Sequence, residues 1–239
     1  MLELIKTKNT MKVTDKITIT NEDNMLLMSR YPDNYFDLAI VDPPYGINAD
    51  KKQNETGKRR IEANGKSKSG RGWKVYKETE WDNEIPSDDY FMELFRVSKK
   101  QIIWGGNYFP LIWNYSNSFI IWNKKQREFS LADGELAWYS EKEKALRIFD
   151  FSRAEALSDA NNNGSRLHPT QKPVALYKWI LDKYAKEGDK ILDTHLGSGS
   201  IAIACHDYKY ELTACELDKE YYDKAIQRIT NHTNQQKLF

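Results

Sequence analysis

The segment Lys190-Ile191-Leu192-Asp193-Thr194-His195-Leu196-Gly197-Ser198-Gly199 carries the pattern that decides the fold. It begins with a short apolar run that ends in an acid, as expected of a buried strand. Two glycines then precede a helix predicted through 201–204, and a further strand is predicted over 211–215. A last helix places four apolar side chains at helical spacing: Tyr222, Ala225, Ile226 and Ile229. This order of elements is typical of a doubly wound α/β sheet.

The glycine loop is flanked by two acids that limit the kind of ligand it can take. With Ala202, the loop matches the dinucleotide fingerprint G-x-G-x-x-A, which is a weak signal by itself. Asp193 at the strand end would repel a pyrophosphate, but it suits the ammonium group of a methionine-type ligand. Glu216 ends the next strand and can accept hydrogen bonds from ribose hydroxyls. The alternative is an ordinary tight turn between strand and helix.

The rest of the chain alternates between strand and helix patterns. Strands are predicted over 17–20, 36–41, 101–104, 119–122, 135–139 and 145–149, helices over 25–28, 88–98 and 173–186, and a loop over 156–167. The alternation predicts a Rossmann-like α/β fold, with a doubly wound, mostly parallel sheet in one domain over 1–239.

Forty residues follow Gly199, which is too few for the three strands of a nucleotide-binding half. We therefore expect the strand over 17–20 to supply the missing partner, with Asp23 or Asn24 placed to meet an adenine ring. Such a sheet would be circularly permuted.

The tetrad Asp42-Pro43-Pro44-Tyr45 follows directly on the strand over 36–41. The prolines end the strand, because proline cannot donate to a sheet ladder. Asp42 and the Pro43 carbonyl can accept hydrogen bonds from an exocyclic amine and orient its lone pair, and the two prolines hold that carbonyl rigidly. Tyr45 offers a face on which an extruded base can stack. A Pro-Pro turn with a surface tyrosine is the plainer interpretation.

Bulk properties exclude several classes of protein. The 36 lysines and arginines nearly balance 35 acids, so any polyanion-binding surface must be local. Cys205 and Cys215 lie in apolar runs without a zinc spacing, which indicates buried thiols and no metal site. Residues 1–20 lack an apolar signal core, and no stretch approaches membrane-spanning length. We expect a cytoplasmic protein with no membrane contact; a homodimer stays open.

Together these motifs resemble the β class of DNA amino-methyltransferases, and specifically its adenine-N6 enzymes. Members place the Asp-Pro-Pro-Tyr motif before the cofactor loop, which is the permuted order found here. They also carry a segment that stands intact as His168-Pro169-Thr170-Gln171-Lys172-Pro173. In the family it lines the pocket for the methionine end of the cofactor, and a cation at a helix start suits a carboxylate.

The resemblance implies base flipping, direct methyl transfer, S-adenosyl-L-methionine as cofactor and DNA as partner. It implies a catalytic role for Asp42, Pro43, Pro44 and Tyr45. The residues expected at the cofactor are Asp23, Asn24, Asp42, His168, Thr170, Lys172, Asp193, His195, Leu196, Gly197, Ser198, Gly199, Glu216 and Leu217.

The chain departs from the family pattern in two places. His195 replaces the aromatic residue that usually packs near the cofactor, and we interpret it as a packing substitute. The region expected to recognise the target sequence is also small, because only about 141–167 remains for it.

Either recognition is minimal, or the basic segment over 47–80, which is predicted to be a flexible loop, shares the task through DNA contact. Trp73 and Tyr76 lie among its cations and could stack on bases. The cations expected to contact DNA are Lys51, Lys52, Lys58, Arg59, Arg60, Lys66, Lys68 and Arg71. A solvated loop is the plainer alternative.

Three other functions compete with adenine-N6 methylation. Cytosine-N4 enzymes share the chemistry but more often begin the tetrad with serine. Methyltransferases of RNA or of protein glutamine resemble the tetrad but usually place the cofactor loop first. A non-enzymatic DNA-binding module would not need Asp42, Tyr45, Asp193 and Gly197 intact.

Overall fold

The computed structural model describes residues 10–48, 55, 82–127, 132–142, 145–158 and 171–235. Its sheet contains strands β1 (Thr10–Lys12), β2 (Ile17–Thr20), β3 (Leu38–Val41), β4 (Gln101–Trp104), β5 (Ser118–Asn123), β6 (Gly134–Tyr139), β7 (Leu146–Asp150), β8 (Lys190–Asp193) and β9 (Glu211–Cys215). The helices are α1 (Asn24–Met28), α3 (Asp88–Val97), α4 (Arg153–Ser158), α5 (Val174–Tyr184), α6 (Ser200–Tyr208) and α7 (Lys219–Thr233), with 3₁₀ turns η1 (Gly106–Tyr108) and η2 (Pro110–Asn114).

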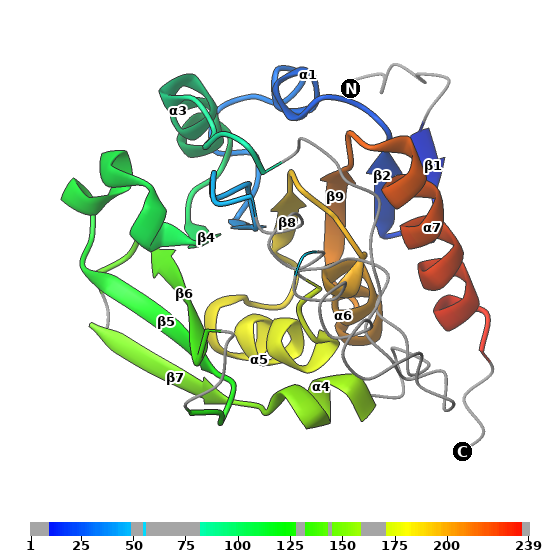
Figure 1. The fold of residues 1–239 in the computed structure, drawn as a ribbon. Coiled ribbons are helices and arrows are strands. Elements are labelled where there is room, and N and C mark those ends of the chain that lie inside the picture. The colour runs from blue at the N-terminus through cyan, green and yellow to red at the C-terminus, as the bar shows by residue number, and fades with distance from the viewer. Residues whose placement is uncertain are drawn as a thin grey trace.

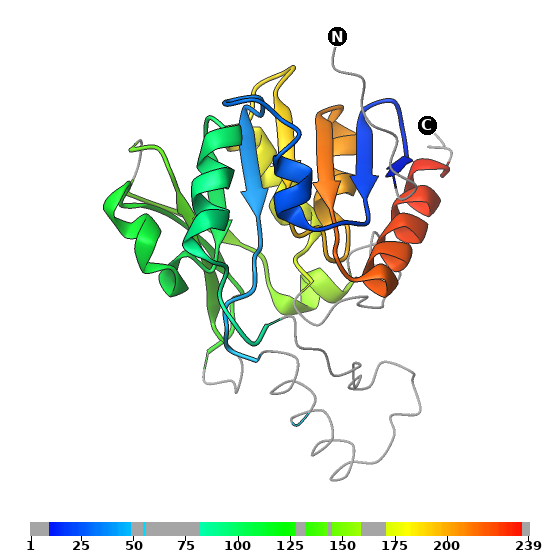
Figure 2. The ribbon, with the colours of Figure 1, turned by 90° about the horizontal axis from the view of Figure 1, so that it is seen from above.

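The strands form one sheet in the order β1-β2-β9-β8-β3-β4-β6-β5-β7. From β2 to β4 all neighbours are parallel, whereas β1 and β6 pair antiparallel with their neighbours and β7 runs parallel to β5. The predicted α/β class and the mostly parallel sheet are confirmed. Figure 2 shows the parallel strands side by side, with their carboxyl ends at one edge.

Helices cover both faces of this sheet, as Figure 1 shows for α1 and α3 on one side and α5 and α6 on the other. Successive residues of β3 point to opposite faces: Leu38 and Ile40 pack in the core under α5 and α6, and Ala39 and Val41 in the core under α1 and α3. All four are buried. A strand covered on both faces is a continuous apolar run, which is why the sequence pattern identifies it.

The N-terminal strand supplies the missing neighbour of the glycine-loop half. Strand β2 pairs with β9 in parallel, from Ile17 opposite Leu212 to Thr20 opposite Cys215. Strand β3 pairs with β8. The tetrad after β3 and the loop after β8 therefore leave the sheet at the same edge, although some 150 residues separate them in the sequence.

One loop prediction is wrong at its start. Residues 156–167 were expected to be loop, but α4 continues through Ser158. The Ser152 hydroxyl accepts from the Glu155 amide at 3.1 Å, and the Glu155 carboxylate accepts from the Ser152 amide at 2.6 Å. This reciprocal capping box explains the helix and was readable as Ser-x-x-Glu. Residues 159–167, and all the cations expected to contact DNA, lie outside the described residues.

The two cysteines are in the buried state expected from their apolar surroundings. Cys205 and Cys215 are buried free thiols. Within the described ranges, no helix has the length and apolarity needed to cross a bilayer.

Candidate active site

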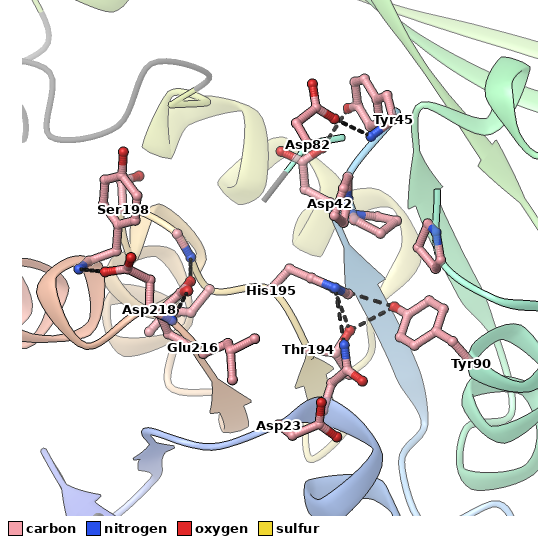
Figure 3. A pocket seen from close by; sticks show the side chains of 18 of the residues that line it. Asp23, Asp42, Tyr45, Asp82, Tyr90, Thr194, His195, Ser198, Glu216 and Asp218 are labelled. Carbon is pink, nitrogen blue, oxygen red and sulfur yellow. Dashed lines mark hydrogen bonds between the residues drawn. The ribbon is translucent and has the colours of Figure 1, made fainter. Parts of the chain in front are cut away.

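A cavity of about 640 Å³ opens at the carboxyl edge of the parallel strands. The segments that follow β2, β3, β8 and β9 line it, joined by residues before and within α3 and by the residues before α5. Ligands of open α/β sheets bind at this edge. Figure 3 shows Asp42, Tyr45 and Asp82 gathered in one part of the pocket and Glu216, Ser198 and Asp218 in another, with His195 between them.

Most of the residues predicted from the sequence meet in this cavity. Those that line it are Asp23, Asn24, Asp42, Pro43, Pro44, Tyr45, Lys172, His195, Leu196, Gly197, Ser198, Glu216 and Leu217. Asp193 and Gly199 are not part of the lining. His168 and Thr170 lie outside the described residues.

The tetrad is held in place by its own side chains and by an acid from elsewhere in the chain. The Tyr45 hydroxyl donates to Asp42 Oδ1 at 2.5 Å. Asp82 Oδ1 accepts from the amides of Tyr45 at 2.6 Å and Gly46 at 3.0 Å. Gly46 has φ +70°, a conformation that glycine adopts without strain. The backbone after the two prolines is thus held by the Asp82 carboxylate at its amides and by the hydrogen bond between the Tyr45 and Asp42 side chains.

Lys172 has partners other than those expected for a residue that binds the cofactor carboxylate. Its Nζ lies 2.5 Å from Asp42 Oδ2 and 3.1 Å from Glu135 Oε2. Lys124 holds the other oxygen of Glu135 at 2.6 Å. The structure therefore links Lys172 directly to the first residue of the tetrad.

Burial and charge set the ionisation of this group. Burial raises the pKa of Asp42 and Glu135 adds to the rise, while Lys172 opposes it. Burial acts on Glu135 in the same way, but Lys172 and Lys124 outweigh it and hold its pKa at about 2. The two carboxylates outweigh the burial of Lys172 and raise the pKa of its ammonium.

Glu216, the acid that follows β9, faces the glycine loop. Its Oε2 accepts from the Gly197 amide at 2.8 Å, and its Oε1 accepts from the Asp218 amide at 3.0 Å. Gly199 has φ +75°, and a Cβ there would come within 2.8 Å of Ile229 Cδ1. The positive φ favours glycine at this position, and a side chain there would also displace the end of Ile229 on α7.

Asp193 is buried, with 2 % of its surface exposed, and accepts from the His195 amide at 3.0 Å. Burial raises the pKa of this carboxyl to about 8, and the nearby Asp42 and Glu216 add to the shift. Asp193 precedes the lining residue Thr194 in the chain, so its charge acts on the cavity although its side chain does not line it.

His195 belongs to a chain of hydrogen bonds that sequence reasoning did not find. Asn24 Nδ2 donates to His195 Nε2 at 3.2 Å, so the ring proton lies on Nδ1, where the Thr194 hydroxyl accepts at 2.9 Å. The Tyr90 hydroxyl lies 2.7 Å from that of Thr194. Burial lowers the pKa of His195 to about 3, so the ring is neutral. The ring is more than a packing substitute, because both nitrogens have polar partners.

Several lining residues had no signal that identified them as part of a site. Some had a structural signature only: Ser87 and Asp218 cap helices, and Tyr90 lies on the buried face of α3. Gln171 and Thr194 lie in motifs quoted from the sequence but were not named as site residues. The other lining residues that the sequence did not single out are Glu22, Met25, Asp82, Glu84, Ile85, Pro86, Ser87, Tyr90, Tyr177, Ser200, Asp218 and Tyr221.

Acids dominate the charged lining. They are Glu22, Asp23, Asp42, Asp82, Glu84, Glu216 and Asp218, and Lys172 is the single lysine among the described lining residues. Such a cavity favours a ligand with a net positive charge.

Comparisons with known proteins identify relatives of this chain. The Type II methyltransferase M.HpaI of Haemophilus parainfluenzae is 24% identical over 84% of this chain and 70% of its own length. The Type II methyltransferase M.HinfI of Haemophilus influenzae is 24% identical over 89% of this chain and 68% of its own.

Solved structures share the fold. The complex of M1.HpyAVI with SAM matches with TM-score 0.54 and 22% identity, covering 89% of this chain and 99% of that one. The cytosine-N4-specific PvuII DNA methyltransferase matches with TM-score 0.57 and 11% identity, covering 95% and 89%. TTHA0409 of Thermus thermophilus, complexed with S-adenosyl-L-methionine, matches with TM-score 0.53 and 16% identity, covering 91% and 95%.

The family profile for DNA methylases of the N6/N4 type matches residues 36–227, from the strand before the tetrad into the last helix. The match contains the tetrad, the lysine bound to it, the glycine loop and Glu216. The chain therefore belongs to the N6/N4 DNA methylase family.

Proposed function

We propose that this DNA methylase transfers a methyl group from S-adenosyl-L-methionine to N6 of adenine in DNA, after extrusion of the base from the duplex. One observation carries the proposal: Asp42 of the strand-end tetrad and the Gly197–Glu216 pair line the same cavity. An acceptor for an amino group and a cradle for a nucleoside are thereby brought together.

The cavity has the size and charge that this cofactor requires. A volume of about 640 Å³ lies within the range of small-molecule sites. The acidic lining suits the sulfonium and ammonium charges. We assign Glu216 to the ribose hydroxyls and Asp23, Asn24 and Leu217 to the adenine ring, with Gly197 and Ser198 along the backbone of the loop.

Asp193 and the segment with His168 and Thr170 are assigned to the methionine end. Asp193 suits the ammonium group because a cation beside it would favour the ionised carboxylate.

The protein's task in the reaction is to present the amino nitrogen correctly. When bound, the cofactor would supply an electrophilic methyl group, with the carbon–sulfur electrons left on sulfur. The amino nitrogen would form the new bond with its lone pair and release its proton to solvent water. Asp42 and the Pro43 carbonyl accept hydrogen bonds from the amino group and direct its lone pair. Tyr45 stacks on the extruded base.

Adenine is favoured over cytosine by the first residue of the tetrad. Enzymes acting on cytosine N4 more often begin it with serine, and this chain has Asp42. Asp42 is also built into a charge network with Lys172, and a serine there could not pair with the ammonium in this way.

DNA contact is assigned to the basic segment between the tetrad and Asp82. Its lysines and arginines would neutralise phosphates, and its position in the chain next to the tetrad would place them near the target base.

The test is a nucleoside digest of DNA incubated with the protein and S-adenosyl-L-methionine. N6-methyladenine is expected, and Asp42→Ala should lower its formation by about 10²- to 10³-fold. Asp15→Asn, which removes an exposed carboxylate, is the matched control and should keep full activity. N4-methylcytosine as the only product would refute the adenine assignment, and full activity in Asp42→Ala would refute the site.

A further inference from the structure

The ammonium of Lys172 is enclosed by the tetrad and its neighbours. The side chain is 1% exposed, and Nζ has three acceptors in reach: Asp42 Oδ2 at 2.5 Å, Glu135 Oε2 at 3.1 Å and the Tyr45 oxygen at 3.3 Å. An ammonium has three N–H donors. All three can thus be used within the protein, which leaves no donor for a cofactor carboxylate in this arrangement.

Lys172 is fixed at both ends. Its backbone carbonyl accepts from the Ser200 hydroxyl at 2.8 Å, at the start of α6. At the other end, Nζ lies 5.1 Å from the centroid of the Trp104 ring, and Lys124 holds Glu135 in place. A side chain held in this way can define the orientation of the carboxylate it contacts.

Lys172 is the cation among the described charged and titratable groups around Asp42. These are Lys172 before α5, Glu135 on β6, Tyr45 in the tetrad, Tyr177 on α5 and Asp193 on β8. Burial and Glu135 favour the neutral acid, and Lys172 favours the carboxylate. A protonated Asp42 would lose acceptor capacity toward an amino group.

We propose that Lys172 is a positioning residue that keeps Asp42 ionised and fixes its carboxylate where it accepts a hydrogen bond from the target amino group. Glu135 holds the Lys172 ammonium in place, although its own charge opposes the ionisation of Asp42. The inference rests on the proposed function of Asp42. It gives Lys172 a role in the methyl-transfer step instead of in cofactor binding.

The pH profile of kcat at saturating cofactor and DNA tests this role. Lys172→Met keeps the length of the side chain and removes its charge; kcat should fall about 10- to 100-fold. The acidic limb of the profile should move to higher pH. Glu135→Gln removes a carboxylate that disfavours ionisation of Asp42, so its acidic limb should move to lower pH. A general loss of structure would not shift the two variants in opposite directions.

Cofactor affinity separates this role from the cofactor-binding role. Isothermal titration calorimetry with S-adenosyl-L-methionine should give a Kd for Lys172→Met that is no weaker than that of the wild type. A weakened Kd with an unchanged kcat at saturation would overturn the proposal, and so would unchanged pH limbs in both variants.

A measurement that does not depend on enzyme activity separates this inference from the proposed function. Carboxyl-carbon NMR titration, with Asp42 assigned through Asp42→Asn, should show Asp42 titrating at higher pH in Lys172→Met and at lower pH in Glu135→Gln. If the wild type methylates no DNA, the proposed function fails, but this titration still decides whether Lys172 controls Asp42. If Lys172→Met does not fold, Lys172→Gln takes its place: titration of Asp42 at higher pH in that variant supports the proposal, and an unchanged titration refutes it.

Discussion

The ring of Tyr108 stacks on the ring of Tyr45, with centroids 5.1 Å apart and planes inclined by 14°. Tyr108 lies at the end of η1 and is 39% exposed, whereas Tyr45 also contacts Phe109 edge-on. The proposed base-stacking residue therefore already has an aromatic partner in the protein without DNA. Tyr108 comes from a segment whose elements, η1 and η2, were not predicted from the sequence.

We expect Tyr108 to cover the second face of the extruded base once that base lies on Tyr45. Tyr108→Ala should weaken binding of DNA with 2-aminopurine at the target position by about 1–3 kcal/mol, since stacking on one aromatic ring contributes that much. The fluorescence increase on binding should also be smaller. Tyr108→Phe keeps the ring and should behave as the wild type. Equal affinity in Tyr108→Ala would show that Tyr108 covers Tyr45 only in the protein without DNA.

Gly105 approaches Tyr45 so closely that no side chain fits between them. A Cβ on Gly105 would lie 2.2 Å from Tyr45 Cε1, and Gly105 has φ +70°. Gly105→Ala should therefore displace the tyrosine and lower kcat. It should also destabilise the folded protein by about 1–2 kcal/mol through backbone strain.

Gly188→Ala is the matched control for this substitution. Gly188 also has positive φ, at +89°, but nothing lies within 4 Å of its added Cβ. The Gly188→Ala variant should have a lower Tm because of backbone strain and an unchanged kcat. Equal kcat values in the two variants would show that the clash at Tyr45 is absorbed without effect on catalysis.

The sequence predicted those parts of the fold that depend on local pattern. Strand β3 and the middle of strand β8 are apolar, as expected where both faces of a sheet are covered, and the tetrad and glycine loop mark where the two strands end. Parallel strands place their carboxyl ends at one edge, so the meeting of Asp42 with Gly197 followed from the topology.

Contacts between residues distant in the sequence were not predictable in the same way. Asp82 binds the Tyr45 amide across 37 residues, and Glu135 reaches Lys172 from β6. Neither acid lies in a recognisable sequence motif. The partner of each acid is distant in the sequence and comes close only in the folded protein. The resemblance to known enzymes assigned Lys172 to the cofactor, since it rests on the motif that contains the lysine and not on the acids that face it.

The basic segment gives a prediction about salt. Replacing Lys58, Arg59 and Arg60 with glutamine should weaken DNA binding. The slope of log K against log salt should become shallower by about 0.9 for each phosphate that the variant no longer neutralises. Binding measured by fluorescence anisotropy from about 50 to 200 mM salt would give the slope, since phosphate contacts have a large effect on affinity over this range.

Glutamine at Lys183, Lys219 and Lys224, three lysines on α5 and α7, removes equal charge and should leave the slope unchanged. Equal slopes in both triple variants would exclude the segment as a phosphate-binding surface.

Asp193 gives a prediction about pH and stability. The folded protein holds its pKa at about 8, above the value of an exposed aspartate, so folding favours the protonated form. The contribution of Asp193 to stability is then fully present at acidic pH, below the pKa of the unfolded chain. It is lost progressively as pH rises from that value to about 8. Asp193→Asn cannot ionise, so its Tm relative to the wild type should rise between about pH 5 and pH 8 in protein without cofactor.

Thermal unfolding of the two proteins at several pH values within this range measures the difference. The exposed Asp15→Asn variant should show no such trend. With S-adenosyl-L-methionine bound, the difference should shrink or reverse, because an ammonium beside Asp193 would stabilise the carboxylate that asparagine lacks. A Tm difference that does not vary with pH would mean that Asp193 is ionised in the folded protein without cofactor, and it would contradict the raised pKa of this carboxyl.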